Sequence, residues 1–238
     1  MNAATQKPVP TTDYEFPTLE FAANYRNALL AEFRPRLRGR VLEAGAGIGQ
    51  FTALLLREAG IERFVASEPD PRFVERLRGQ FPLLELIAGT IEAVPTAWPF
   101  DTILSINVLE HIAEDERELA AYRTRLAERR GALCLFVPAR PEIFGTIDRD
   151  FGHCRRYRRG ELRAKLKAAG FRIEHLSYFN LAGYFAWWWN FRLRRKHGFD
   201  PAAVRIFDRF IFPLQHALES RLLRPAIGQS LIAVAVAG

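Results

Sequence analysis

Residues 41–51 have the sequence Val-Leu-Glu-Ala-Gly-Ala-Gly-Ile-Gly-Gln-Phe, and this stretch decides the fold. An apolar run ends in Glu43, and glycines alternate at Gly45, Gly47 and Gly49 before a helical pattern begins. The apolar run is typical of a buried parallel strand. Glycines let the backbone turn sharply and approach a ligand, and the N–H groups of the next helix point into the turn. The stretch therefore predicts a nucleotide-type loop at the carboxyl end of a strand.

The rest of the chain alternates between short apolar runs and helical patterns. Helices are predicted at 18–33, 50–59, 71–79, 114–129 and 160–169. Strands are predicted at 41–44, 63–67, 84–88, 101–106, 132–137, 171–179 and 230–237. This alternation predicts an α/β fold in which helices cover both faces of a mostly parallel sheet. With 238 residues, 49% of them hydrophobic, the chain can form one full core.

Four further segments follow the glycine loop in a fixed order. Glu68 ends the second strand about 20 residues past the loop, the position at which an acid grips a ribose diol. Segments 86–95, 100–112 and 131–138 supply three more strands and their turns. The glycine spacing is E-x-G-x-G-x-G, and Gln50 stands where a dinucleotide loop has its third glycine. Over roughly residues 20–180, these motifs resemble those of the class I S-adenosylmethionine-dependent methyltransferases.

The resemblance implies a Rossmann-like sheet of seven strands with an antiparallel last strand, and S-adenosyl-L-methionine as cofactor. The glycine loop would hold the methionine end, Glu68 the ribose, and residues 90–92 the adenine. Some related O-methyltransferases bind a metal with an E-x-x-E-H turn, but its first position here is Asn107, so no metal site is expected. The implied cofactor-binding residues are Glu43, Gly45, Gly47, Gly49, Gln50, Glu68, Pro69, Thr90, Ile91, Glu92, Asn107 and Val108.

Residues 151–162 carry a second motif, which follows the fifth strand. The segment resembles a G-H-x-R-R-Y segment of a bacterial subgroup of these methyltransferases, of the type 11/12 kind, often found in glycan or lipid biosynthesis. Arg155, Arg156 and Tyr157 are candidates for acceptor binding, because guanidinium groups suit anions. The alternative is that these side chains brace the loop by hydrogen bonds. His111 and His153 are the candidate catalytic bases, although His111 also fits a helix N-terminus without chemistry.

A long insertion, residues 181–229, separates the last two strands and has the pattern of amphipathic helices. Its aromatic run at 184–189 has three interpretations: packing onto the sheet, a lid over a hydrophobic acceptor, or contact with a membrane surface. The net charge of +7 allows attraction to anionic partners, but the sequence has no nucleic-acid-binding module. A homodimer through the aromatic insertion is a further possibility.

We expect one methyltransferase domain at 18–238 after a flexible leader at 1–17. Within it, residues 18–40 would form a cap helix, 41–138 the cofactor-binding half, and 139–238 the acceptor-side half. No apolar run reaches the roughly 18 residues that a membrane span needs, and two cysteines give no disulfide framework. We expect a cytoplasmic protein, with peripheral contact to a membrane as an alternative.

The resemblance predicts methyl transfer from S-adenosylmethionine to an acceptor that the sequence does not identify. An oxygen nucleophile on a small molecule, a glycan or a lipid intermediate is expected. Two alternatives stay open: a nucleotide-dependent oxidoreductase of the Rossmann type, and a methyltransferase-like scaffold that binds partners without turnover.

Overall fold

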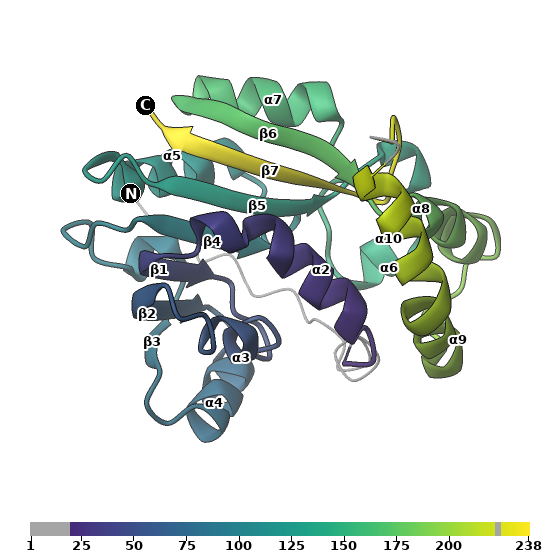
Figure 1. Ribbon diagram of the computed structural model, residues 1–238, viewed down its shortest axis with the longest axis horizontal. Coiled ribbons are helices and arrows are strands. Elements are labelled where there is room, and N and C mark those ends of the chain that lie inside the picture. Colours follow the sequence, from purple (N-terminus) through teal and green to yellow (C-terminus); the bar gives the residue numbers. More distant parts are fainter. Residues whose placement is uncertain (1–19, 222–224) are drawn as a thin grey trace, which may run out of the picture.

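Seven strands form one twisted sheet in the order β3-β2-β1-β4-β5-β7-β6 (Figure 1). The computed structural model describes residues 20–221 and 225–238; the predicted leader at 1–17 lies outside them. Neighbouring strands from β1 to β5 are parallel, and β7 is antiparallel to both β5 and β6. The predicted seven-stranded, mostly parallel sheet with an antiparallel last strand is confirmed. The strands are β1 Gly39–Ala44, β2 Ile61–Glu68, β3 Glu85–Ala88, β4 Thr102–Ile106, β5 Ala132–Pro138, β6 Phe171–Phe179 and β7 Ser230–Ala237.

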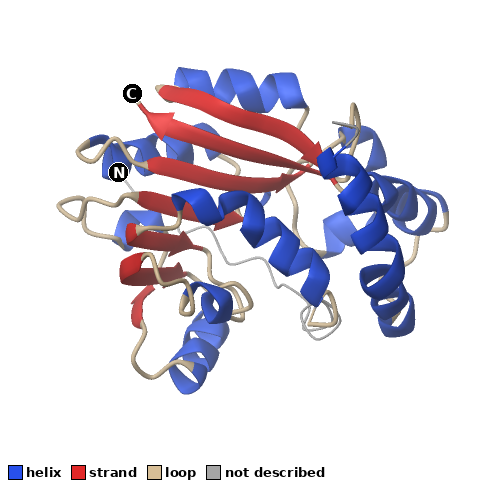
Figure 2. Ribbon diagram, viewed as in Figure 1, coloured by secondary structure: helices blue, strands red, loops and turns tan. Residues whose placement is uncertain are grey.

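Helices cover both faces of the sheet (Figure 2). In β5, Leu133 and Leu135 pack in the core beneath α5 and α7, whereas Cys134 and Phe136 pack against α2 and α10 on the opposite face. Side chains alternate between the faces of a strand, so an unbroken apolar run is what two covered faces require. The helices are α2 Ala23–Phe33, α3 Thr52–Leu55, α4 Pro71–Gln80, α5 Asp115–Ala127, α6 Thr146–Asp150, α7 Arg159–Ala168, α8 Leu181–Trp187, α9 Pro201–Ile206 and α10 Phe212–Arg221.

Two predicted helices differ from the structure. The helix expected at 50–59 is only the four-residue α3, because residues 56–60 form tight turns and Leu56 is half exposed. The helix expected at 18–33 begins at Ala23 within the described residues, and its buried side chains pack on a sheet face. A cap over the cofactor therefore stays a prediction for the segment 18–40. By contrast, α4 agrees with the helix predicted at 71–79: it begins at Pro71, and the Asp70 side chain caps it.

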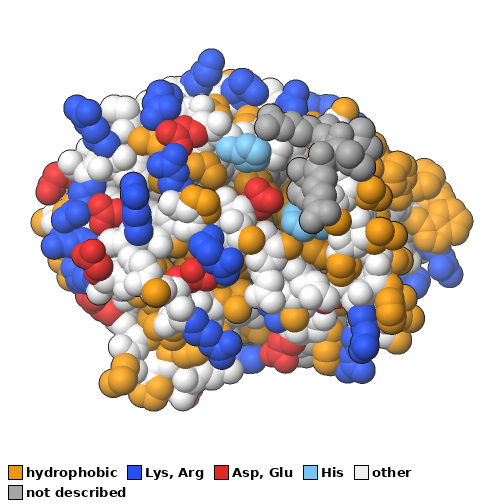
Figure 3. Space-filling model, in the orientation of Figure 1, with side chains coloured by type: hydrophobic (Ala, Val, Ile, Leu, Met, Phe, Trp, Pro, Cys, Tyr) orange, Lys and Arg blue, Asp and Glu red, His pale blue; other side chains and the backbone are white. Residues whose placement is uncertain are grey.

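Within the insertion, residues 181–193 and 201–221 are helical, as predicted, and these helices have two different faces. Its inner side chains Trp187 and Phe191 pack against Ile143, Ile147 and Phe151. Its outer side chains are between 43% and 67% exposed, and Figure 3 shows hydrophobic atoms gathered at that end of the molecule. We call the following set the apolar surface: Phe185, Trp188, Trp189, Leu193, Ile206, Phe210, Ile211, Leu214 and Leu218. No helix of the described residues is long and apolar enough to cross a membrane.

Candidate active site

The glycine loop lies where β1 meets the turn that follows β4. Gly45, Gly47 and Gly49 all have positive φ, with values of 75°, 56° and 86°. Gly45 also lies so close to Val108 that a Cβ added there would stand 2.4 Å from Val108 Cγ2. Only glycine adopts this conformation at low cost. The loop N–H of Gly45 donates to the Ser67 carbonyl at 2.9 Å, which ties it to β2.

Two buried carboxylates flank this loop. Glu43 accepts a hydrogen bond from the Thr52 hydroxyl at 2.6 Å, and burial raises the pKa of Glu43 to about 8. Glu68 accepts from the backbone N–H of Gly47 at 2.7 Å and from that of Asp70 at 2.8 Å, and burial raises its pKa as well. A carboxylate has about four acceptor positions. The N–H groups of Gly47 and Asp70 use two of these positions, so Glu68 shapes the loop and can still accept hydrogen bonds from two ligand hydroxyls.

The remaining predicted cofactor residues fall on the same edge of the sheet. Thr90 caps a single 3₁₀ turn, Ile91–Ala93, in which the Ile91 side chain is buried and the exposed Glu92 pairs with Arg117 at 2.6 Å. An adenine could therefore meet the backbone of this turn but not the Ile91 side chain. The other residues lie at strand ends and turns: Gln50 before α3, the exposed Pro69 after β2, and the exposed Asn107, with φ of 52°, after β4.

The two predicted bases, His111 and His153, lie together. Their rings are edge-to-face with centroids 4.7 Å apart. The backbone of Cys154 brings them together, because its N–H donates to the carbonyl of Glu110 at 2.8 Å. Burial, followed by the nearby His153, lowers the pKa of His111 to about 3, and burial lowers the pKa of His153. Both imidazoles are therefore neutral near pH 7.

Glu110 completes this group, and the sequence analysis gave it no role. Its side chain is fully buried, and neither carboxylate oxygen has a hydrogen-bond partner among the described residues. Burial raises the pKa of Glu110 to about 8. One ligand atom from each of Glu110, His111 and His153 lies within 4.8 Å of the other two. Buried carboxylates are normally paired, so an unpaired one marks a functional position. We call these three residues the Glu-His-His cluster.

A second residue that the sequence analysis missed, Asp148 of α6, fixes the position of His153. Its carboxylate accepts from His153 Nδ1 at 3.1 Å, Arg156 Nε at 2.7 Å, the Gly145 N–H at 2.8 Å and Trp187 Nε1 at 3.2 Å. Burial opposes ionisation of Asp148, but the His153 hydrogen bond and the Arg156 charge outweigh it and lower its pKa. The signal in the sequence is an acid five residues before His153.

The three predicted acceptor-binding residues have structural partners. Arg156 is buried, and its guanidinium pairs with Asp148 and donates to the Ala139 carbonyl at 3.0 Å. Arg155 Nη1 lies 2.9 Å from Asp115 Oδ2, and the Tyr157 hydroxyl lies 2.8 Å from the same oxygen. These contacts support the bracing interpretation over direct acceptor contact. A role in acceptor binding stays a prediction for these residues.

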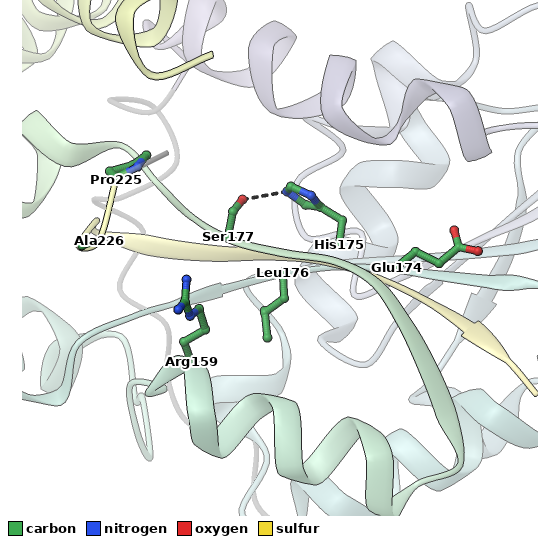
Figure 4. Close-up of a pocket in the computed structure, with 7 residues that line it drawn as sticks. All are labelled: Arg159, Glu174, His175, Leu176, Ser177, Pro225 and Ala226. Atoms are coloured by element: carbon green, nitrogen blue, oxygen red, sulfur yellow. Dashed lines mark hydrogen bonds between the residues drawn. The ribbon is translucent and has the colours of Figure 1, made fainter. Parts of the chain in front are cut away.

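A pocket also lies along the edge strand β6, away from the glycine loop. Figure 4 shows its lining, in which His175 Nε2 and Ser177 Oγ are 2.7 Å apart. It contains none of the predicted site residues. The carboxyl ends of β1, β2 and β4 therefore remain the candidate site, as expected for an open α/β sheet.

Comparison with known proteins identifies the family. A family model described as a methyltransferase domain matches residues 19–176, which is most of the chain and includes every cofactor motif. The chain belongs to this family. It is a methyltransferase, and S-adenosyl-L-methionine is its methyl donor. The match excludes the oxidoreductase alternative. The residues that the family model matches end before the insertion at 181–229.

Solved structures share the fold at low sequence identity. An S-adenosylmethionine-dependent methyltransferase from Mesorhizobium loti has a TM-score of 0.60 at 16% identity, over 90% of this chain and 98% of that one. A Thermotoga maritima methyltransferase, described as a possible histamine N-methyltransferase, has a TM-score of 0.60 at 17% identity, over 93% of both chains. The complex of DhpI with S-adenosylhomocysteine has a TM-score of 0.56 at 16% identity, over 91% of this chain and 86% of that one. No curated protein matches the chain in sequence.

Proposed function

We propose that this methyltransferase methylates an oxygen nucleophile on a lipid or lipid-linked glycan intermediate. The observation that carries the oxygen assignment is the Glu-His-His cluster beside the turn after β4. It holds two neutral imidazoles and a buried carboxyl group that has no hydrogen-bond partner among the described residues. A hydroxyl is a poor nucleophile until its proton is removed or its oxygen is polarised. Neutral imidazole nitrogens can do this, and the Glu110 carboxyl, whose pKa is raised to about 8, can do so once it is ionised.

In the proposed reaction, the acceptor oxygen attacks the methyl carbon of the sulfonium. The O–C bond forms as the C–S bond breaks, S-adenosylhomocysteine leaves, and the acceptor proton passes to the cluster or to solvent. The protein supplies alignment and exclusion of water. Glu43 and the glycine loop would hold the methionine end, Glu68 the ribose, and the turn at 90–92 the adenine. Asn107 and Val108 would lie beside the cofactor.

The assignment of a lipid-borne acceptor rests on the apolar surface. The helices that carry it follow directly from β6, so the insertion begins at the same edge of the sheet as the cofactor loop. Exposed aromatic and aliphatic side chains of this number are uncommon on a monomer that has no partner. Exposed basic residues lie within the same segment, and they complement an anionic membrane surface: Arg192, Arg194, Arg195, Lys196, Arg205 and Arg209.

Vesicle binding tests this membrane contact. We expect the protein to co-sediment with phosphatidylglycerol vesicles, to bind phosphatidylcholine vesicles weakly, and to dissociate in high salt because the Debye length shortens. Replacing Trp188 and Trp189 together by serine should remove binding. Leu83→Ser is the matched control, because Leu83 is a fully exposed leucine that precedes β3, outside the insertion. Concentration-dependent dimers that the tryptophan substitutions abolish, without vesicle binding, would assign the surface to a homodimer instead.

The acceptor itself is tested with radiolabelled methyl donor. Total membrane lipid extract and a soluble metabolite extract are offered to the same enzyme, and products are separated by organic extraction. Label in an alkali-resistant lipid product supports an ether-type O-methylation. Label only in water-soluble products would contradict the lipid assignment and leave the methyltransferase activity intact.

A further inference from the structure

We infer that Glu110, His111 and His153 form a binding site for one divalent transition-metal ion. The donor atoms of the three side chains favour such an ion. Two imidazoles and one carboxylate are donors that Zn²⁺ and related ions accept, whereas Mg²⁺ and Ca²⁺ prefer oxygen alone. Only the role of the ion rests on the proposed function: a bound ion would polarise an acceptor hydroxyl that reached it.

The carboxyl group of Glu110 also favours a bound cation. It is fully buried, and both oxygens lack a hydrogen-bond partner among the described residues. Its Oε1 lies 3.9 Å from His153 Nε2, which is too far for a hydrogen bond. Tetrahedral Zn²⁺ with bonds of about 2.0–2.2 Å holds its ligand atoms about 3.4 Å apart. The side chains therefore need to approach by up to about 1.5 Å to enclose such an ion, a movement that rotation about their own bonds can supply.

A hydrogen bond on the far side of the His153 ring also fits a metal site. His153 Nδ1 faces Asp148 Oδ1 at 3.1 Å, so the ring donates through Nδ1 and leaves the Nε2 lone pair toward Glu110. Metal-ligating histidines almost always donate their other N–H to a carboxylate or carbonyl in this way. The guanidinium of Arg156, whose charge acts on both Glu110 and His153, is already paired with Asp148 at 2.7 Å.

This site differs from the expectation of no metal, because one of its ligands lies outside the linear motif. That expectation rested on Asn107, which replaces the first glutamate of an E-x-x-E-H turn. The third ligand comes instead from His153, 42 positions after His111, and only the folded chain brings it to the turn. Linear spacing within residues 107–111 cannot show a ligand from the loop that follows α6.

Titration of the metal-free full-length protein with Zn²⁺ and with Co²⁺ tests the inference. We expect one ion per chain, and Co²⁺ should give the intense visible bands of a four-coordinate site. Glu110→Gln and His153→Ala should each weaken binding at least tenfold. Asp148→Asn should weaken it by about 10–100-fold as the orienting residue. His197→Ala is the matched control, because His197 is an exposed histidine paired with Asp150 outside the cluster. It should leave binding unchanged.

Two outcomes would overturn the site. The first is wild-type protein that binds no ion. The second is stoichiometric binding that Glu110→Gln and His153→Ala leave unchanged while His197→Ala removes it. Where a variant does not fold, X-ray absorption of the wild-type Co²⁺ protein decides. Scattering from two imidazoles supports the site, and a spectrum without imidazole scattering refutes it. The protein should bind S-adenosylhomocysteine with the same affinity with and without metal. Failure of the metal site can therefore be distinguished from failure of the proposed function.

Discussion

Replacing the buried Arg156 distinguishes the two roles that its sequence allows, bracing of the loop and acceptor binding. Arg156→Ala leaves the Asp148 carboxylate without its ion pair and removes a donor from the Ala139 carbonyl. It also removes the guanidinium that lies 4.5 Å from the centroid of the Trp187 ring. Breaking one partner of a buried ion pair costs about 3–5 kcal/mol, because the other charge stays buried. For a domain of this size that loss lowers the melting temperature by roughly 6–20 °C.

Calorimetric melting of the cofactor-free protein measures this loss. Arg158→Ala is the matched control, because its side chain is 66% exposed and lies 3.9 Å from Glu142. Exposed pairs contribute about 0–1 kcal/mol, so the control should melt within a few degrees of wild type. Arg156→Lys should fall between the two, since it keeps a charge without the planar fork. Wild-type stability in Arg156→Ala, together with a raised acceptor KM, would refute the structural role and restore Arg156 as an acceptor-binding residue.

Three further predictions concern single side chains. Glu68→Ala should weaken S-adenosylhomocysteine binding by about 1.5–3 kcal/mol, the usual contribution of hydrogen bonds to a charged group, and a calorimetric change below about twofold would place Glu68 away from the ribose. Burial raises the pKa of Glu43 to about 8, so its contribution to stability is full below its unfolded pKa near 4.5 and is lost as the pH rises toward 8. The free energy of unfolding in urea should therefore fall between pH 5 and 8, and Glu43→Gln should remove the part of that fall that Glu43 causes. Identical pH profiles in the variant and the wild type would contradict this prediction. Tyr157→Phe should cost about 1.5–3 kcal/mol of stability, because its hydroxyl bonds the Asp115 carboxylate, without changing cofactor affinity; an unchanged melting curve would show that this bond contributes nothing.

The sheet could be predicted because its signals are local. The run at 132–137 is apolar at every position, and β5 buries all of its residues between two helical layers. Asp70 followed by Pro71 predicts the start of α4, and the structure begins the helix there. The glycine loop was recognisable because its φ values exclude most other residues. In each case the residues that form the feature are neighbours in the chain.

The candidate site was less predictable because its partners are distant in the chain. An arginine in a loop has the same local sequence whether it meets a ligand or, like Arg156, the carboxylate of Asp148. Glu110 lies in a recognised turn, but its surroundings depend on the distant Cys154, whose N–H bonds the Glu110 carbonyl, and its side chain has no hydrogen-bond partner among the described residues. The five-residue helix α6, which carries Asp148, is too short to show a helical period. Charge and spacing along the chain therefore cannot show these contacts, which depend on residues that are distant in sequence.

The most direct test of the cofactor site is calorimetry with S-adenosylhomocysteine. Wild-type protein should bind one molecule per chain. Gly47→Val should bind none while its circular dichroism stays native, because a branched side chain at φ of 56° distorts the loop. Gly160→Val, at a helix position with open space around the added Cβ, is the control and should bind normally. Equal affinity in folded Gly47→Val and wild-type protein would contradict the placement of the cofactor in this loop.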